Sequence, residues 1–248
     1  MPDELVHYDV IGGVAVITLD SQHNKNALSR QLVTELVERL DRAEQDDEAK
    51  VVLLRAEGNV FCSGADLSEM AAGPEDAPRA MVSIFRKITA HPKPVVAKVH
   101  GAVRAGGIGI VGACDIVVAD EHATFALTEV RLGLTPAVIS LTLLPRMTPR
   151  AASLTFLTGS TFTGREAVDY GLVTRAVPDD ELNLVVDEIC GELAKGHPQG
   201  LRETKKLLGD AFTQHIDEGT DEMAALSARL FASDAAREAM LAFLSRKK

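Results

Sequence analysis

The stretch VFCSGADL at residues 60–67, taken with AGG at residues 105–107, decides the fold of this chain. Each is a turn of small residues that directly follows an apolar run suited to a buried strand. Small residues leave backbone N–H groups uncovered, and two such groups that meet at one point stabilise negative charge on a carbonyl oxygen. The two turns therefore predict a backbone oxyanion hole, and with it chemistry on an ester or a thioester.

Composition limits the classes of protein to consider. The chain has 248 residues, which fits one large domain with or without a helical extension. Hydrophobic residues make up 46% of it, enough for a substantial core, while the net charge of −10 argues against nucleic acid as a partner.

Cysteine and histidine spacing gives no sign of a disulfide framework or a metal site. Cys62, Cys114 and Cys190 lie far apart, and the seven histidines form no H-x-x-x-H pair. The N-terminus lacks the pattern of a signal peptide, and the longest apolar run, residues 108–119, is too short to cross a bilayer. We therefore expect a cytoplasmic protein with no membrane partner.

Apolar runs alternate with helical patterns along the first two thirds of the chain. Leucines recur every four residues between Leu28 and Leu40, which predicts a helix over residues 29–45 with Ser29 as its N-cap. Buried strands are expected at residues 14–19, 51–54, 95–99 and 116–119, and further helices at 79–90 and 140–158. This alternation predicts an α/β core over residues 1–195. Residues 196–248 show only helical patterns and are expected to pack in an oligomer.

Several segments in order resemble one family. They are NAL at residues 26–28, FCSGADL at 61–67, HGAVRAGG at 100–107, EVRLGL at 129–134, LTG at 157–159 and GLV at 171–173. In this order and spacing the chain resembles the crotonase superfamily, the enoyl-CoA hydratase/isomerase family. The resemblance implies a spiral of ββα repeats, acyl-CoA substrates, and trimers or pairs of trimers.

The resemblance also implies roles for individual residues. Ala65 and Gly106 match the two oxyanion-hole N–H donors, and Glu129 matches a catalytic glutamate that acts as general acid and base. No metal or redox cofactor is expected, because the thioester itself accepts electron density. The predicted substrate-binding residues are Lys25, Ala27, Ser63, Ala65, Asp66, Leu67, Arg104, Gly106, Phe243 and Lys247.

One position departs from the two-glutamate pattern of the hydratases. The second glutamate's place holds Gly109, which leaves a mechanism with one carboxylate. We predict a hydratase, which adds water to a 2-enoyl-CoA. The alternative is an isomerase, which transfers a proton between C2 and C4 and so moves a double bond. For hydration, we hypothesise that an ordered water occupies the space left by Gly109.

Other interpretations remain open at this stage. Glu129 could be a surface residue paired with Arg131, and Asp66 could serve only as a helix cap. Arg104 is hypothesised to face the acyl pocket and favour a polar acyl group. The GIGIVG run at residues 107–112 imitates a dinucleotide-binding loop, but the preceding strand ends too early for it. If the chain is not an enzyme, the alternative is a non-catalytic protein that binds acyl-CoA.

Overall fold

Two sheets and a set of helices form the computed structural model, which describes residues 4–66, 69 and 77–245. The large sheet has the order β1-β2-β3-β5-β7-β10, in which only the β1–β2 pair is antiparallel. The small sheet has the order β4-β6-β8-β9, in which only the β8–β9 pair is antiparallel. The strands are β1 (Val6–Ile11), β2 (Val14–Leu19), β3 (Val51–Ala56), β4 (Val60–Cys62), β5 (Val95–Val99), β6 (Ala102–Arg104), β7 (Ile116–Asp120), β8 (Thr124–Ala126), β9 (Thr161–Thr163) and β10 (Arg175–Val177).

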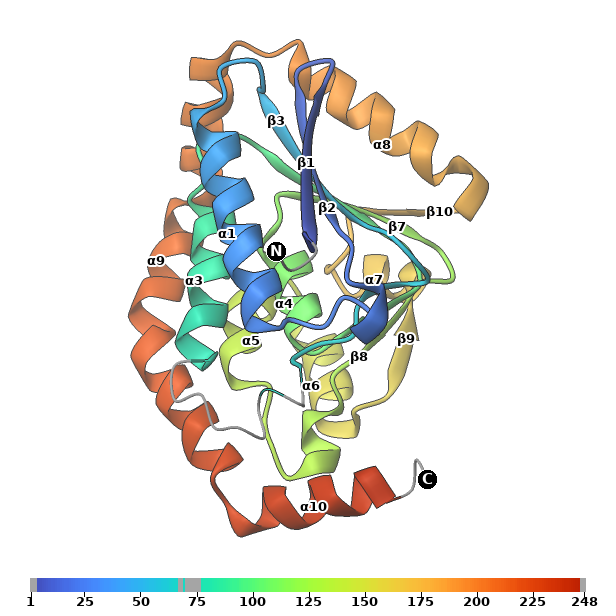
Figure 1. Ribbon diagram of the computed structural model, residues 1–248, viewed down its shortest axis with the longest axis vertical. Helices are drawn as coiled ribbons and strands as arrows, with labels where there is room; N and C mark the ends of the chain where they lie inside the picture. The colour runs from blue at the N-terminus through green and yellow to red at the C-terminus, as the bar shows by residue number, and fades with distance from the viewer. Residues whose placement is uncertain (1–3, 67–68, 70–76, 246–248) are drawn as a thin grey trace.

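Helices cover both faces of the large sheet. In Figure 1, α1, α3 and α9 stand together on one side and α8 lies on the other. The helices are α1 (Arg30–Gln45), α3 (Ala77–Thr89), α4 (Gly106–Ala113), α5 (Ala137–Leu143), α6 (Pro149–Thr158), α7 (Gly164–Asp169), α8 (Asp179–Ala194), α9 (Pro198–Phe231) and α10 (Asp234–Ser245), with short 3-10 helices η1 (Gln22–Asn24) and η2 (Thr128–Leu132).

Burial on both faces explains why the central strands are apolar throughout. Along β2, Ala15 and Ile17 face the core under α1 and α3, while Val14 and Val16 face α8. All six residues of β2 are buried, as expected for a strand with helices on either side. The expected strands at 14–19, 51–54, 95–99 and 116–119 are confirmed. Ser29 caps α1 as predicted, since its hydroxyl accepts from Leu32 N at 3.3 Å.

The predicted ββα repeat is present in the strand order. In each repeat a long strand joins the large sheet, a strand of three residues joins the small sheet, and a helix follows. The pairs β3–β4, β5–β6 and β7–β8 are three such repeats, followed by α3, α4 and the 3-10 helix η2. The sequence analysis did not anticipate β1, β4, β6 or β9.

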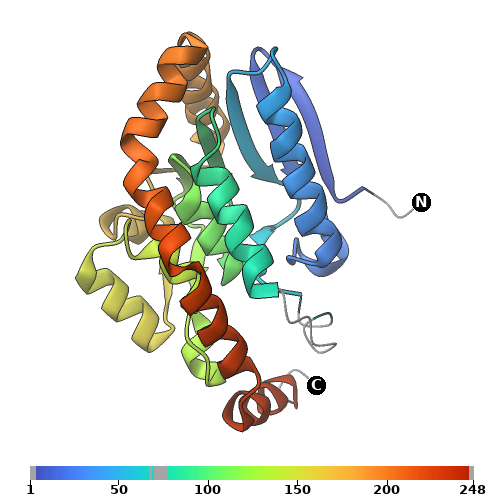
Figure 2. The same cartoon turned by 90° about the vertical axis from the view of Figure 1, so that its left-hand side faces the viewer.

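The C-terminal region is helical, as expected, and α9 is fastened to the core. Lys205 on α9 is buried, and its ammonium group donates to the carbonyls of Ile88 at 2.9 Å and Lys93 at 3.1 Å. The same group lies 2.8 Å from the Asp115 carboxylate. Figure 2 shows α9 running the length of the molecule against the core, with α10 crossing below it. No described helix has both the length and the apolar character to cross a membrane.

Candidate active site

Three neighbouring strand ends bring the predicted catalytic residues together. β4, β6 and β8 are adjacent and parallel in the small sheet, so their C-terminal ends lie at one edge. Ala65 follows β4 by three residues, Gly106 follows β6 by two, and Glu129 follows β8 by three. All three line one cavity of about 530 Å³. Each repeat of the fold thus supplies one element of the candidate site, at the sheet edge where open α/β folds bind ligands.

The N–H groups of Ala65 and Gly106 donate to no residue that the structure describes. Leu28 pairs with Ala65 in a parallel bridge in which Leu28 N donates to Gly64 O at 2.8 Å, so Ala65 N is not used. Gly106 begins α4, where the first N–H groups have no intrahelical acceptor. Both donors are therefore free to bind an oxygen atom of a ligand.

Backbone strain sets the direction of the second donor. Ala105, directly before Gly106, has φ 46° and ψ −119°, a conformation that an L-residue rarely adopts. Such strain persists only where the surroundings enforce it, and it is concentrated at functional sites. Gly64 has φ 95°, and a Cβ at this position would lie 3.1 Å from the Ala105 Cβ. The two turns are thus packed against each other.

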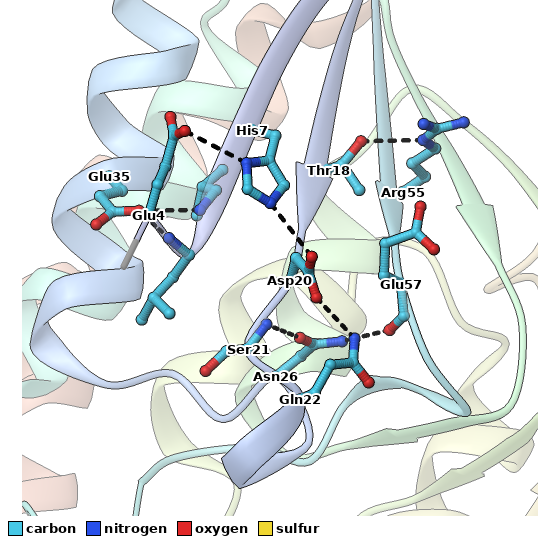
Figure 3. A network of polar contacts seen from close by, with 12 residues as sticks. Glu4, His7, Thr18, Asp20, Ser21, Gln22, Asn26, Glu35, Arg55 and Glu57 are labelled. Carbon is cyan, nitrogen blue, oxygen red and sulfur yellow. Dashed lines mark hydrogen bonds and ion pairs between the residues drawn. The ribbon is translucent and has the colours of Figure 1, made fainter. Parts of the chain in front are cut away.

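Two asparagines hold the first turn. Asn26 is buried, accepts from Ser21 N at 2.7 Å, and donates to the Glu57 carbonyl at 3.0 Å (Figure 3). It also donates to the Val60 carbonyl at 2.8 Å. These bonds fix the segment that continues to Leu28, the partner of the Gly64–Ala65 turn. The sequence analysis included Asn26 in the family-like NAL segment at residues 26–28 but predicted no role for its side chain.

Asn24 connects three of the predicted substrate-binding residues. Its side-chain Oδ1 accepts a hydrogen bond from Ala27 N at 3.3 Å, and its side-chain amide donates to the Asp66 carboxylate at 3.0 Å. Its backbone carbonyl accepts from the Ser63 hydroxyl at 3.1 Å. Asp66 lines the cavity. Lys25 lies in this segment in the left-handed region with φ 59°, and its side chain is exposed.

Glu129 is the carboxylate best suited to proton transfer. Its Oε2 is buried and has no hydrogen-bond partner among the described residues. Burial raises the pKa of Glu129 from 4.5 to about 6, because removing water disfavours the charged form. The suggested ion pair with Arg131 is wrong: the Arg131 guanidinium donates to Thr158 O at 3.3 Å.

The other two cavity carboxylates are engaged. Asp66 accepts from Asn24, and Glu69 Oε2 accepts from Arg30 N at 2.7 Å. Glu129 therefore differs from both in presenting a buried oxygen that no described residue satisfies. No cluster of three or more potential metal ligands was found within the part of the chain that the structure describes.

The contacts of Arg104 do not fit the hypothesis that it reads the acyl group. It is not among the described residues that line the cavity. Its guanidinium donates to Thr124 O at 2.6 Å, to the Thr124 hydroxyl at 3.1 Å and to Val103 O at 2.8 Å. Arg104 thus cross-links β6 to β8, a strand pairing that the sequence analysis had not anticipated.

The structure describes no side chain for three of the predicted binding residues. Leu67 and Lys247 lie outside the described residues. Phe243 falls within α10, and its side chain is not described. Their predicted contacts with a substrate stay predictions.

The comparisons with known proteins identify the family. The family model for enoyl-CoA hydratase/isomerase matches residues 9–248. The chain belongs to this family. A crystal structure of an enoyl-CoA hydratase from Mycobacterium avium has 45% sequence identity and a TM-score of 0.92, and the match covers 98% of this chain and 97% of that one.

Relatives in the family carry out different reactions. The 2,3-dehydroadipyl-CoA hydratase of Escherichia coli (strain K12) is 29% identical over 239 residues, 94% of this chain and 93% of that protein. The mitochondrial Delta(3,5)-Delta(2,4)-dienoyl-CoA isomerase of Rattus norvegicus is 30% identical over 229 residues, 84% of this chain and 69% of that protein. The chain is therefore an enzyme of a hydratase/isomerase family that acts on acyl-CoA, and its own reaction must be argued from its site.

The hypothesis of a water beside Gly109 is wrong. A Cβ placed on Gly109 would lie 2.3 Å from Phe85 Cζ and 2.9 Å from Ile139 Cγ2. Both side chains are buried, so α3 and α5 fill the space in which the sequence analysis had placed the water. Apolar side chains fill this position, where a second carboxylate would otherwise stand.

The packing against Gly109 predicts opposite effects for two glycine substitutions. Gly109→Ala forces a methyl group against Phe85 and should lower the free energy of unfolding by about 1–3 kcal/mol. Gly191→Ala on α8 is the matched control, because nothing lies within 4 Å of its added Cβ. It should raise stability by about 0.5–1 kcal/mol through helix propensity. Urea unfolding measures both, and a Gly109→Ala variant as stable as the parent would show that the space is open.

Proposed function

We propose that this protein is an enoyl-CoA hydratase that adds water across the 2,3 double bond of an acyl-CoA. The observation that carries the proposal is the unpartnered Glu129 carboxylate oxygen in the same cavity as the free N–H groups of Ala65 and Gly106. A thioester oxygen between these two N–H groups would place the adjoining carbons in the cavity that Glu129 lines. Names of relatives such as 2,3-dehydroadipyl-CoA hydratase support the assignment.

In the proposed mechanism, electron density moves from water to the thioester. Glu129 takes a proton from the water molecule as its oxygen bonds to C3, and the electron pair of the double bond moves toward the thioester oxygen. Ala65 and Gly106 stabilise that enolate oxygen, each by about 3–4 kcal/mol. The same glutamic acid then gives a proton to C2, so that water adds across the bond and Glu129 returns to its starting state. The thioester takes the role that a metal or redox cofactor would otherwise fill.

Replacing the carboxylate tests this assignment. Glu129→Gln preserves shape but can neither accept nor deliver the proton, and hydration of crotonyl-CoA should fall about 10²–10⁴-fold. The assay follows loss of the conjugated enone absorbance. Glu188→Gln on the exposed face of α8 is the control and should retain full activity. Undiminished hydration by Glu129→Gln would remove Glu129 from the mechanism.

Burial of Glu129 predicts the pH dependence of hydration. The base must be ionised to accept a proton from water, and its pKa of about 6 lies above the ordinary 4.5. We expect kcat/KM to be level at neutral pH and to fall tenfold per pH unit below about 6, with one ionisation on the acid side. A profile still level at pH 5 would contradict the raised pKa.

A double-bond isomerase is the second candidate, and the filled space at Gly109 favours it. An isomerase needs no water, and one carboxylate suffices to carry a proton from C4 to C2 of a 3-enoyl-CoA. The apolar contact of Phe85 and Ile139 with Gly109 suits such a dry site. With 3-hexenoyl-CoA an isomerase would produce the conjugated absorbance that a hydratase consumes. Acyl-CoA binding with turnover of neither compound would support a non-catalytic role.

We also propose that the chain acts as a trimer or a pair of trimers, with Lys25, Lys247 and Phe243 contributing to CoA binding. Exposed leucines on α9, Leu207 and Leu208, support an interface, because side chains 82% and 79% exposed in one chain would be covered in an assembly. A cytoplasmic location stays a prediction from the sequence.

A further inference from the structure

A row of side chains on α9 runs from the core into the candidate active site. Gly219, Met223, Ser227 and Phe231 are spaced four residues apart, so they lie on one face of the helix. Two members of the row contact α5: Gly219 packs against Leu141, and Met223 Sδ lies 3.7 Å from the Ser140 hydroxyl. The last two members of the row line the cavity.

The direction of the row places Ser227 beside the first residues of α5. Passing from Gly219 to Met223 on α9 moves the contact from Leu141 back to Ser140 on α5, so the two helices run in opposite directions. One more turn of α9 leads to Ser227, which lines the cavity together with Pro136 and Ala137 at the start of α5. This wall directly follows η2, the 3-10 helix that carries Glu129. Ser227 and Glu129 therefore line the same cavity.

The hydroxyl of Ser227 has no hydrogen-bond partner among the described residues, and its oxygen is accessible in the cavity that the residue lines, although the residue as a whole is only 8% exposed. Other hydroxyls inside helices are satisfied by their own backbone: Thr220 donates to Ile216 O at 2.6 Å, and Thr155 donates to Ala151 O at 2.8 Å. A ligand that covers this hydroxyl without pairing it cuts a polar group off from water, which is unfavourable. A ligand that offers a hydrogen-bonding group at this point satisfies it instead.

We propose that Ser227 determines specificity by hydrogen-bonding an oxygen-bearing substituent on the acyl group of the substrate. The inference rests on the proposed acyl-CoA function and narrows it from unsubstituted chains to acyl groups that carry a hydroxyl, carbonyl or carboxylate oxygen. Selectivity of this kind is strong, because an analogue without the oxygen covers the Ser227 hydroxyl and leaves it unpaired. Phe231, one turn further along the row, contributes an apolar surface beside this contact.

Calorimetric binding of saturated acyl-CoAs tests the proposal without depending on turnover. The ligands are hexanoyl-CoA and the same compound with a hydroxyl group at C4, C5 or C6. We expect at least one hydroxylated ligand to bind the parent protein at least fivefold more tightly than hexanoyl-CoA. Ser227→Ala should abolish this preference and leave the affinity for hexanoyl-CoA within twofold.

Two controls keep the result specific to the hydroxyl group. Ser227→Thr retains a hydroxyl and should retain part of the preference. Ser153→Ala removes a hydroxyl on α6 that donates to Pro149 O, outside the cavity lining, and should change neither affinity. Thermal unfolding of each variant establishes that it is folded.

The outcomes separate this inference from the proposed reaction. The parent protein could fail to hydrate crotonyl-CoA while Ser227→Ala still loses the preference for hydroxylated ligands. That result would support the role of Ser227 and reject the proposed hydration. Hydration of crotonyl-CoA with no preference for any hydroxylated ligand would overturn the role of Ser227. Equal weakening of all four ligands by Ser227→Ala would overturn it too, because it would indicate packing rather than a hydrogen bond.

Discussion

Parallel pairing of three short strands is the constraint on which the candidate active site depends. β4, β6 and β8 each have three residues, yet their alignment brings Ala65, Gly106 and Glu129 to one cavity. Strands so short gain little from their own hydrogen bonds. Their position is set by the long strands that precede them, since β3, β5 and β7 are neighbours in the large sheet. The large sheet thus sets the position of the candidate site, because each of its strands β3, β5 and β7 leads directly into one of the three short strands.

Small residues at the turns make this alignment possible. A side chain on Gly107 would bring a Cβ within 2.6 Å of Cys62 Cβ, so α4 can approach β4 only with glycine there. The two asparagines and the strained Ala105 then fix the backbone, which leaves two N–H groups without acceptors. Donors fixed in advance need no reorganisation as charge develops, which makes them effective in catalysis. Glu129 completes the arrangement as a carboxylate whose pKa burial has raised.

The sequence predicted the parts of the fold that have strong local patterns. The long strands β2, β3, β5 and β7 are continuous apolar runs, and α1 repeats leucine every four residues, so both were identified. β1 alternates with polar residues such as His7 and Asp9, and β4, β6 and β9 are too short to show a period. Because β6 was not predicted, the contact of the Arg104 side chain with Thr124 on β8 could not be predicted either.

Contacts between distant segments explain the remaining differences. The sequence showed that Gly109 lacks a carboxylate, but Phe85 and Ile139 come from other helices and fill that space only in the folded chain. Ser227 lies in a helix whose sequence pattern does not distinguish the cavity from the core. The small-residue turns and Glu129 could be predicted because family-like motifs surround them, and the structure places all three in one cavity.

The most direct test of the central claim is a crystal structure of the protein with bound butanoyl-CoA, a saturated compound that cannot be hydrated. The account predicts that the thioester oxygen lies about 2.7–3.1 Å from both Ala65 N and Gly106 N. It also predicts that the Glu129 carboxylate faces C2 and C3 of the acyl chain. A thioester oxygen bound away from these two N–H groups, or a Glu129 side chain turned away from the acyl carbons, would contradict it.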